Sequence, residues 1–172
     1  MPHLNIEIKA RCSDATHIRK ILKEHKADYK GTDHQIDTYF EVPVGQLKLR
    51  QGNIENNLIH YQRENQSGPK QSIISLYTTS DAKSLLHTLT QALPLKVVVD
   101  KHREIYFIDN VKFHIDQVKG LGSFVEIEAI DYDGTIGKAK LLEQCQNYLD
   151  LFGITEDDLL SNSYSDILLE QS

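Results

Sequence analysis

Apolar and polar residues alternate along much of this chain with the period of two that is typical of β-strands. The clearest case is residues 4–10, where Leu, Ile, Ile and Ala share one face while Asn, Glu and Lys share the other. Alternation or enrichment in β-branched and aromatic residues predicts further strands at 34–40, 46–51, 58–64, 71–79 and 95–108, and a hairpin at 112–128 that turns at 118–122.

A period near 3.6 residues predicts helices at about 14–26, 82–92 and 136–152. Ser13 is the expected cap of the first helix, and Ser80 or Asp81 that of the second. Gly153 ends the third, and Thr155 begins a short final helix. The second helix should bury an apolar stripe of Leu85, Leu86, Leu89 and Leu93.

The strands carry polar pairs on the face opposite their apolar residues: Glu7/Lys9, Lys48/Arg50, Tyr61/Arg63, Lys101/Arg103, His114/Asp116 and Glu126/Glu128. The helices need the apolar strand faces as partners, so the polar faces must point away from the helices. If the sheet curls, these polar faces line a cavity and the sheet edges disappear. We therefore expect an α+β fold, with a closed or nearly closed antiparallel barrel of about eight strands, a charged lumen and helices outside. A flat sheet with one solvated face is the alternative.

Composition adds few constraints. The 172 residues are 40% hydrophobic and 26% charged, as in an ordinary globular protein, and we expect one domain over residues 1–172. A net charge of -6 argues against a general nucleic-acid binder. Cys12 and Cys145 show no metal or disulfide spacing, so we expect free thiols. Without an apolar signal region or a run long enough to span a membrane, a soluble cytoplasmic protein is the default expectation.

The paired charges indicate the chemistry of the lumen. Grouped lysines and arginines suit a polyanion, and arginine matches phosphate oxygens particularly well. Grouped carboxylates suit a hard divalent cation such as Mg²⁺ or Mn²⁺. Together they predict a site for a metal-bound triphosphate. Ion pairs between the lumen lysines and glutamates are the alternative, which we rank below it.

Several motifs resemble the CYTH superfamily, the triphosphate tunnel metalloenzymes. Asn5-Ile6-Glu7-Ile8-Lys9 resembles its Glu-x-Glu-x-Lys signature. The other motifs follow in the superfamily's order: Asp37-Thr38-Tyr39-Phe40, Leu47-Lys48-Leu49-Arg50, Lys101-x-Arg103 and Phe124-Val125-Glu126-Ile127-Glu128. The class IV adenylate cyclase branch looks most similar. The resemblance covers nearly the whole chain, and it implies an eight-stranded tunnel and metal-dependent chemistry on triphosphates.

Site residues follow from the resemblance by position. The implied metal ligands are Glu7, Glu126 and Glu128, with Asp116 as a helper. The implied phosphate-binding residues are Lys9, Lys48, Arg50, Arg63, Lys101 and Arg103. Lys9, Asp116 and His114 are the candidate catalytic residues. Asn5 departs from the signature, because an amide oxygen can coordinate a cation but brings no charge.

Three functions remain open. The leading one is an adenylate cyclase that converts ATP to cyclic AMP and pyrophosphate. The second is a triphosphatase acting on inorganic, nucleoside or thiamine triphosphate. The third is a non-catalytic triphosphate or polyphosphate sensor, which the neutral Asn5 supports. Phe124 is the only hint of a base-stacking residue. The resemblance alone suggests a homodimer.

Overall fold

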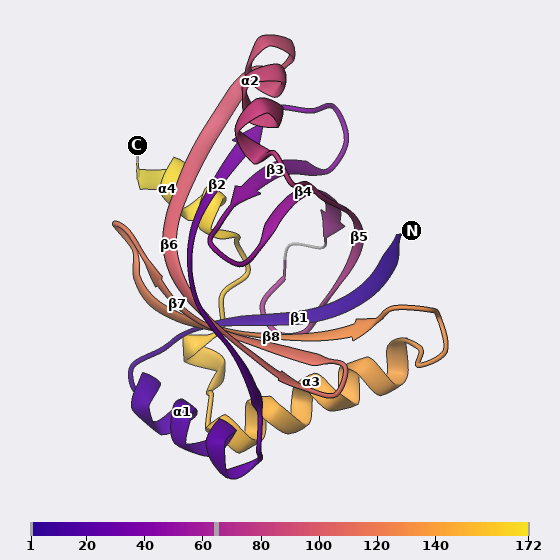
Figure 1. The fold of residues 1–172 in the computed structure, drawn as a ribbon. Coiled ribbons are helices and arrows are strands. Elements are labelled where there is room, and N and C mark those ends of the chain that lie inside the picture. The colour runs from indigo at the N-terminus through magenta and orange to yellow at the C-terminus, as the bar shows by residue number, and fades with distance from the viewer. Residues whose placement is uncertain (1, 64–65, 172) are drawn as a thin grey trace.

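A closed barrel forms the body of the molecule in the computed structural model, which describes residues 2–63 and 66–171 (Figure 1). The described residues form eight strands: β1 (His3–Arg11), β2 (Asp28–Phe40), β3 (Gln46–Gln51), β4 (Asn56–Arg63), β5 (Lys70–Thr78), β6 (Leu95–Ile108), β7 (Val111–Val118) and β8 (Gly122–Asp131). Around the barrel the order is β1-β5-β4-β3-β2-β6-β7-β8, and every neighbouring pair is antiparallel. The predicted barrel is confirmed, and the flat-sheet alternative is wrong.

The strand bounds agree with the sequence pattern except where long-range pairing extends them. β2 begins at Asp28, well before the predicted start at residue 34, because it pairs with β6 along almost its whole length. The predicted end of the fourth strand at residue 64 lies outside the described residues. Alternation could not reveal the extension of β2, because its first residues are mostly exposed on both faces.

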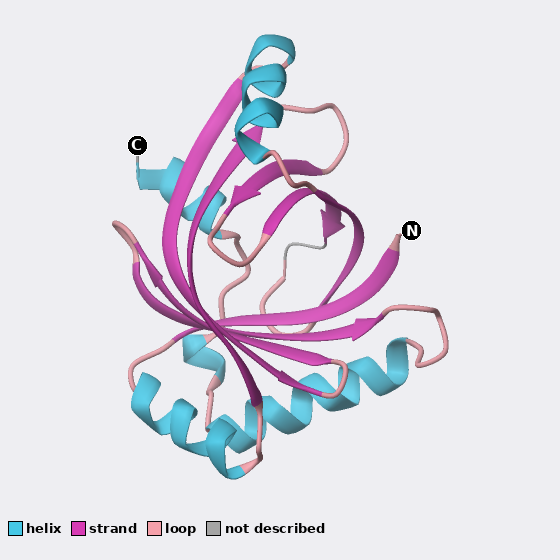
Figure 2. Cartoon of the chain, viewed as in Figure 1, coloured by secondary structure: helices cyan, strands magenta, loops and turns pink. Residues whose placement is uncertain are grey.

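The helices lie outside the barrel wall or across its ends (Figure 2). They are α1 (Ala15–Glu24), α2 (Ala82–Ala92), α3 (Lys138–Phe152), the 3₁₀ helix η1 (Glu156–Asp158) and α4 (Tyr164–Gln171). Asp14, rather than the predicted Ser13, caps α1 by accepting a hydrogen bond from the His17 amide at 3.1 Å. Both residue types cap well, and the cap falls on the residue directly before the first helical one. No helix in the described part of the chain is long and apolar enough to cross a membrane.

The main hydrophobic core lies between one side of the barrel and helices α1 and α3. The outward faces of β1, β7 and β8 supply residues such as Ile8, Phe113 and Ile127, which are at most 1% exposed. Leu22 of α1 and Leu141 of α3 close this core from outside and are fully buried. These apolar strand faces therefore leave the alternate, polar side chains to point into the lumen.

Helix α2 does not bury its leucines as predicted. Asp81 does cap it, accepting from the Ser84 amide at 3.1 Å, but none of its residues is buried. The expected stripe of Leu85, Leu86, Leu89 and Leu93 is only half-buried. Of the strands, α2 mainly contacts β3, and it lies at the rim of the barrel, so its apolar face is only partly covered (Figure 1).

Candidate functional site

The lumen of the barrel contains a cavity of about 340 Å³, within the range of small-molecule sites. All eight strands contribute to its lining. Ten of the predicted site residues line it: Glu7, Lys9, Lys48, Arg50, Arg63, Lys101, Arg103, His114, Glu126 and Glu128. Asp116 lies behind this lining, where it contacts Arg103. The structure thus brings the whole predicted set together.

Strand register places the carboxylates on neighbouring strands. Lys9 of β1 is paired with Glu126 of β8, and Glu7 with Glu128. On the other side of β8, His114 of β7 is paired with Glu126. Directly paired residues of antiparallel strands share a face, so the carboxylates of β1 and β8 gather along one part of the lumen wall.

Opposite charges interleave in this lumen. Glu126 contacts Lys9 at 3.6 Å and Arg103 at 3.2 Å, and Glu7 contacts Arg63 at 2.8 Å. The cations and the carboxylates, which are grouped on different strands in the sequence, therefore meet in the lumen, and the ion pairs ranked second are present. A charge buried without a partner is strongly destabilising, and these ion pairs give each of the charges a partner within the lumen.

Glu126 contacts two cations and a histidine. Burial alone would raise the pKa of its carboxyl group, but the charges of Lys9 and Arg103 hold this pKa well below its usual value. His114 Nδ1 lies 3.3 Å from Glu126 Oε2, and since an ionised carboxylate only accepts, this nitrogen carries the proton. Burial, together with the charge of Arg103, lowers the pKa of His114 to about 3, so its ring is neutral at pH 7.

Glu128 has the opposite shift. Burial raises the pKa of its carboxyl group to about 7, and the nearby charges of Glu7 and Glu126 add to the rise while Lys112 opposes it. The Asn5 amide Nδ2 donates a hydrogen bond to Glu128 Oε1. The adjacent Asn5 Oδ1 is buried and has no hydrogen-bond partner among the described residues.

This shift predicts a pH dependence of stability in the metal-free protein. The folded-state pKa of Glu128, about 7, exceeds the reference value of 4.5, so the native state holds this proton more tightly. The resulting stability is complete below pH 4.5 and is lost as the pH rises to about 7. We expect the free energy of unfolding of the wild type, relative to Glu128→Gln, to fall over this window in urea titrations with chelator. Parallel pH profiles for the two proteins would contradict this prediction.

Asp37 is a site residue that the sequence reasoning did not assign. It is fully buried, and it accepts hydrogen bonds from Arg50 Nε and Nη2, each at 2.9 Å. Lys101 Nζ donates to it at 2.7 Å, and Lys48 Nζ lies 3.3 Å away. One carboxylate therefore orients three of the predicted phosphate-binding side chains. Its alternation with Tyr39 along β2 was the available signal, because both residues face the lumen.

The C-terminal segment contributes a floor to the cavity. Tyr164 donates its hydroxyl to Asp116 Oδ2 at 2.7 Å, and its ring lies 3.7 Å from Lys9 Nζ. Phe124 packs on this ring and is fully buried, so it belongs to the floor and is not exposed for base stacking. Lys70 Nζ donates to the carbonyl of Ser161 at 2.7 Å, which fastens the segment to the wall. The sequence pattern could not place this segment, because it belongs to no strand.

The ligand types present fit a hard divalent cation. Glu7, Glu126 and Glu128 offer carboxylate oxygens, and the unpartnered Oδ1 of Asn5 adds a neutral one. In the described part of the chain, however, no three His, Cys, Asp or Glu side chains are arranged to hold a metal ion. Binding a cation would therefore require Glu7 and Glu126 to exchange their Arg63 and Lys9 contacts for it.

Comparison with known proteins identifies the family. The sequence profile of the CYTH domain matches residues 3–164. A Methanocaldococcus jannaschii protein, named as a candidate adenylate cyclase, is 26% identical over an alignment of 178 positions that covers 95% of this chain and 98% of its own.

Solved structures show the same fold. A Vibrio parahaemolyticus protein, named as a candidate adenylate cyclase, has a TM-score of 0.82 at 19% identity, covering 96% of this chain and 98% of its own. A Hippeastrum protein, described as a candidate adenylyl cyclase with a dominant triphosphatase activity, has a TM-score of 0.59 at 14% identity. The match covers 97% of this chain and 95% of its own. The profile match spans almost the entire chain and agrees with the closed, charged barrel, so this chain belongs to the CYTH domain family.

Proposed function

We propose that this protein is a metal-dependent adenylate cyclase that binds ATP in the barrel lumen. The observation that carries the proposal is the lining of the cavity, which combines cationic side chains with aromatic and apolar ones. Phe107, Ile130 and Tyr132 are among the latter, and a nucleoside can pack on them while its phosphates contact the cations. The name of the Methanocaldococcus jannaschii relative supports the same reaction.

The phosphate chain would be bound by the six predicted cations, Lys9, Lys48, Arg50, Arg63, Lys101 and Arg103. In this proposal they hold the β- and γ-phosphates while the ribose 3′-oxygen lies in line with the α-phosphorus. The 3′-hydroxyl releases its proton to water, its oxygen attacks the α-phosphorus, the bond from this phosphorus to the bridging oxygen breaks, and pyrophosphate leaves. The cations that held its oxygens stabilise the charge that develops on it.

Glu7, Glu126 and Glu128, with the Oδ1 of Asn5, would hold Mg²⁺ or Mn²⁺. When bound, such an ion neutralises phosphate charge and lowers the pKa of a coordinated hydroxyl group.

Asp116 and His114 receive positioning roles. Asp116 accepts two hydrogen bonds from Arg103 and one from Tyr164, so both of its oxygens are engaged. We propose that it orients Arg103. A ring whose pKa is about 3 is a weak base, so we propose that His114 orients Glu126 through their hydrogen bond.

A triphosphatase is the second candidate, because the same cations would present the γ-phosphorus to water. The dominant triphosphatase activity named for the Hippeastrum protein, which shares this fold, favours it. A non-catalytic sensor is the third. The cytoplasmic location and the homodimer stay predictions.

One incubation separates the three functions. Pure protein is mixed with ATP and Mg²⁺ or Mn²⁺, and the products are resolved by chromatography. Cyclic AMP with pyrophosphate is the expected result. Orthophosphate release would indicate a triphosphatase, and thermal stabilisation by triphosphate without turnover would indicate a sensor. If neither ATP nor tripolyphosphate binds or reacts, the lumen is not a triphosphate site.

A further inference from the structure

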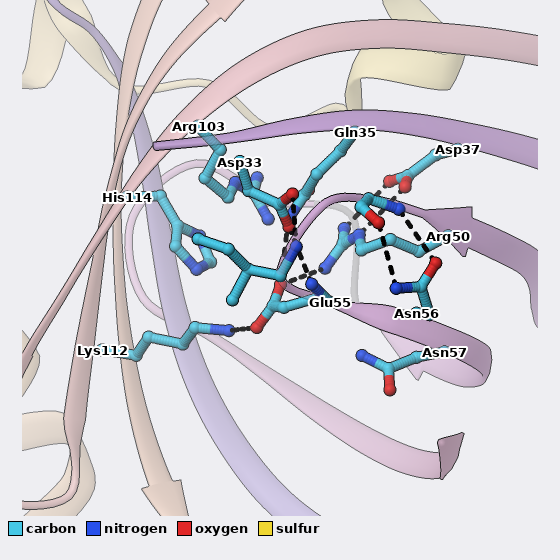
Figure 3. A network of polar contacts seen from close by, with 12 residues as sticks. Asp33, Gln35, Asp37, Arg50, Glu55, Asn56, Asn57, Arg103, Lys112 and His114 are labelled. Carbon is cyan, nitrogen blue, oxygen red and sulfur yellow. Dashed lines mark hydrogen bonds and ion pairs between the residues drawn. The ribbon is translucent and has the colours of Figure 1, made fainter. Parts of the chain in front are cut away.

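The turn between β3 and β4 is held firmly on the barrel wall (Figure 3). The buried carboxylate of Asp33 accepts hydrogen bonds from the backbone amides of Asn53, Ile54 and Glu55 at 2.5, 2.9 and 2.9 Å. Gly52 allows this close approach, because a Cβ there would lie 2.6 Å from both Asp33 carboxylate oxygens. These hydrogen bonds therefore fix the backbone position from which the Glu55 side chain extends.

Glu55 reaches from this turn into the lumen and contacts two cations (Figure 3). Its Oε1 accepts from Arg50 Nη1 at 3.3 Å and from Gln35 Nε2 at 3.0 Å, and its Oε2 accepts from Lys112 Nζ. Burial alone would raise the pKa of this carboxyl group, but Lys112 and Arg50 hold it well below its usual value. The carboxylate is therefore ionised at neutral pH.

Glu55 binds the one terminal nitrogen of Arg50 that Asp37 does not bind. Nε and Nη2 of this guanidinium are already bonded to Asp37, so Nη1 is the terminal nitrogen directed toward the turn. Lys112, which the sequence reasoning did not assign, also lines the cavity. Both side chains would bind phosphate oxygens well, and in this structure the Glu55 carboxylate contacts both.

We propose that Glu55 occupies the position of a phosphate group in the unliganded tunnel and rotates away when a triphosphate binds. It competes with the substrate for Arg50 and Lys112, so it weakens the binding of polyanions that carry too few charges to displace it. A triphosphate carries several negative charges and more acceptor oxygens than one carboxylate, so it displaces Glu55 from Arg50 and Lys112. The inference rests on the proposed function, since it assumes that the lumen binds triphosphates.

Glu55→Gln tests this competition, because glutamine keeps the shape and removes the charge. We expect the variant to bind tripolyphosphate about tenfold more tightly than the wild type in calorimetry with chelator present, since one competing charge is removed. Glu55→Asp, whose shorter side chain cannot hold both cations, should also bind more tightly, by about threefold. This second variant retains the charge. It replaces Glu55→Gln in the test if circular dichroism shows that Glu55→Gln is unfolded.

Glu104→Gln is the matched control. Its side chain is 18% exposed, as is that of Glu55, and it pairs with Arg19 on the outside of the barrel. This variant makes the same change in net charge and should bind tripolyphosphate as the wild type does.

Three results would overturn the inference. If the Glu55 variants and the wild type bind with equal affinity, Glu55 does not compete, and the proposed function stands. If Glu55→Gln binds no more tightly than the wild type with chelator and more weakly with Mg²⁺, Glu55 is a metal ligand instead. If neither the wild type nor the Glu55 variants bind tripolyphosphate, with or without metal, the proposed function fails and the inference fails with it.

Discussion

Replacing Glu126 by glutamine should lower metal-dependent turnover of ATP by at least about a hundredfold, the usual scale for losing a group that stabilises charge at a reacting centre. Glutamine keeps the length of the side chain but removes the charge proposed to bind the metal ion. It also removes an ionic partner of Lys9 and of Arg103, although Arg103 keeps its two hydrogen bonds to Asp116. Initial rates of product formation at saturating ATP and Mg²⁺ measure this effect.

A control variant separates lost chemistry from a damaged fold. Glu143→Gln removes a carboxylate from the surface of α3, where the side chain is 61% exposed, and should leave turnover unchanged. Circular dichroism should show native secondary structure for both variants. If Glu126→Gln retains full turnover, Glu126 is not a metal ligand.

Replacing Asp37 by asparagine should cost about 3–5 kcal/mol of stability, the range observed when one partner of a buried ion pair is removed. The side chain is fully buried, and the variant would leave Arg50, Lys101 and Lys48 without their shared carboxylate. These cations would then repel one another in the barrel interior. Urea unfolding followed by circular dichroism measures the loss.

The same variant should respond more strongly to anions than the wild type. Tripolyphosphate can supply the missing negative charge, so it should raise the melting temperature of Asp37→Asn by more than that of the wild type. Asp28→Asn is the control, because Asp28 pairs with Lys30 on the exposed surface, where an ion pair contributes about 0–1 kcal/mol. Equal stability of Asp37→Asn and wild type would show that Asp37 does not organise the cations.

The alternation of side chains along single strands predicted much of the barrel interior. Alternation along β1 and β8 placed Glu7, Lys9, Glu126 and Glu128 on one face of each strand, and all four line the cavity. The caps of α1 and the burial of α2 were less predictable. Ser13 and Asp14 are both good caps, and the position of α2 at the barrel rim depends on contacts far away in the sequence.

The division of each strand into an apolar face and a charged face was determined by the sequence alone, because the period of side-chain direction is a local property of the backbone. Closure of the sheet, which turns the charged faces into a lumen, was decided by the tertiary structure. The tertiary structure decided which charges meet. Register paired Lys9 with Glu126, and the pairing of β2 with β3 on one side and with β6 on the other brought Lys48 and Lys101 to Asp37. Glu55 enters the lumen from a turn and Tyr164 from the C-terminal segment, where no alternation signals direction. Their positions depend on hydrogen bonds and packing between distant parts of the chain, and a local pattern does not contain that information.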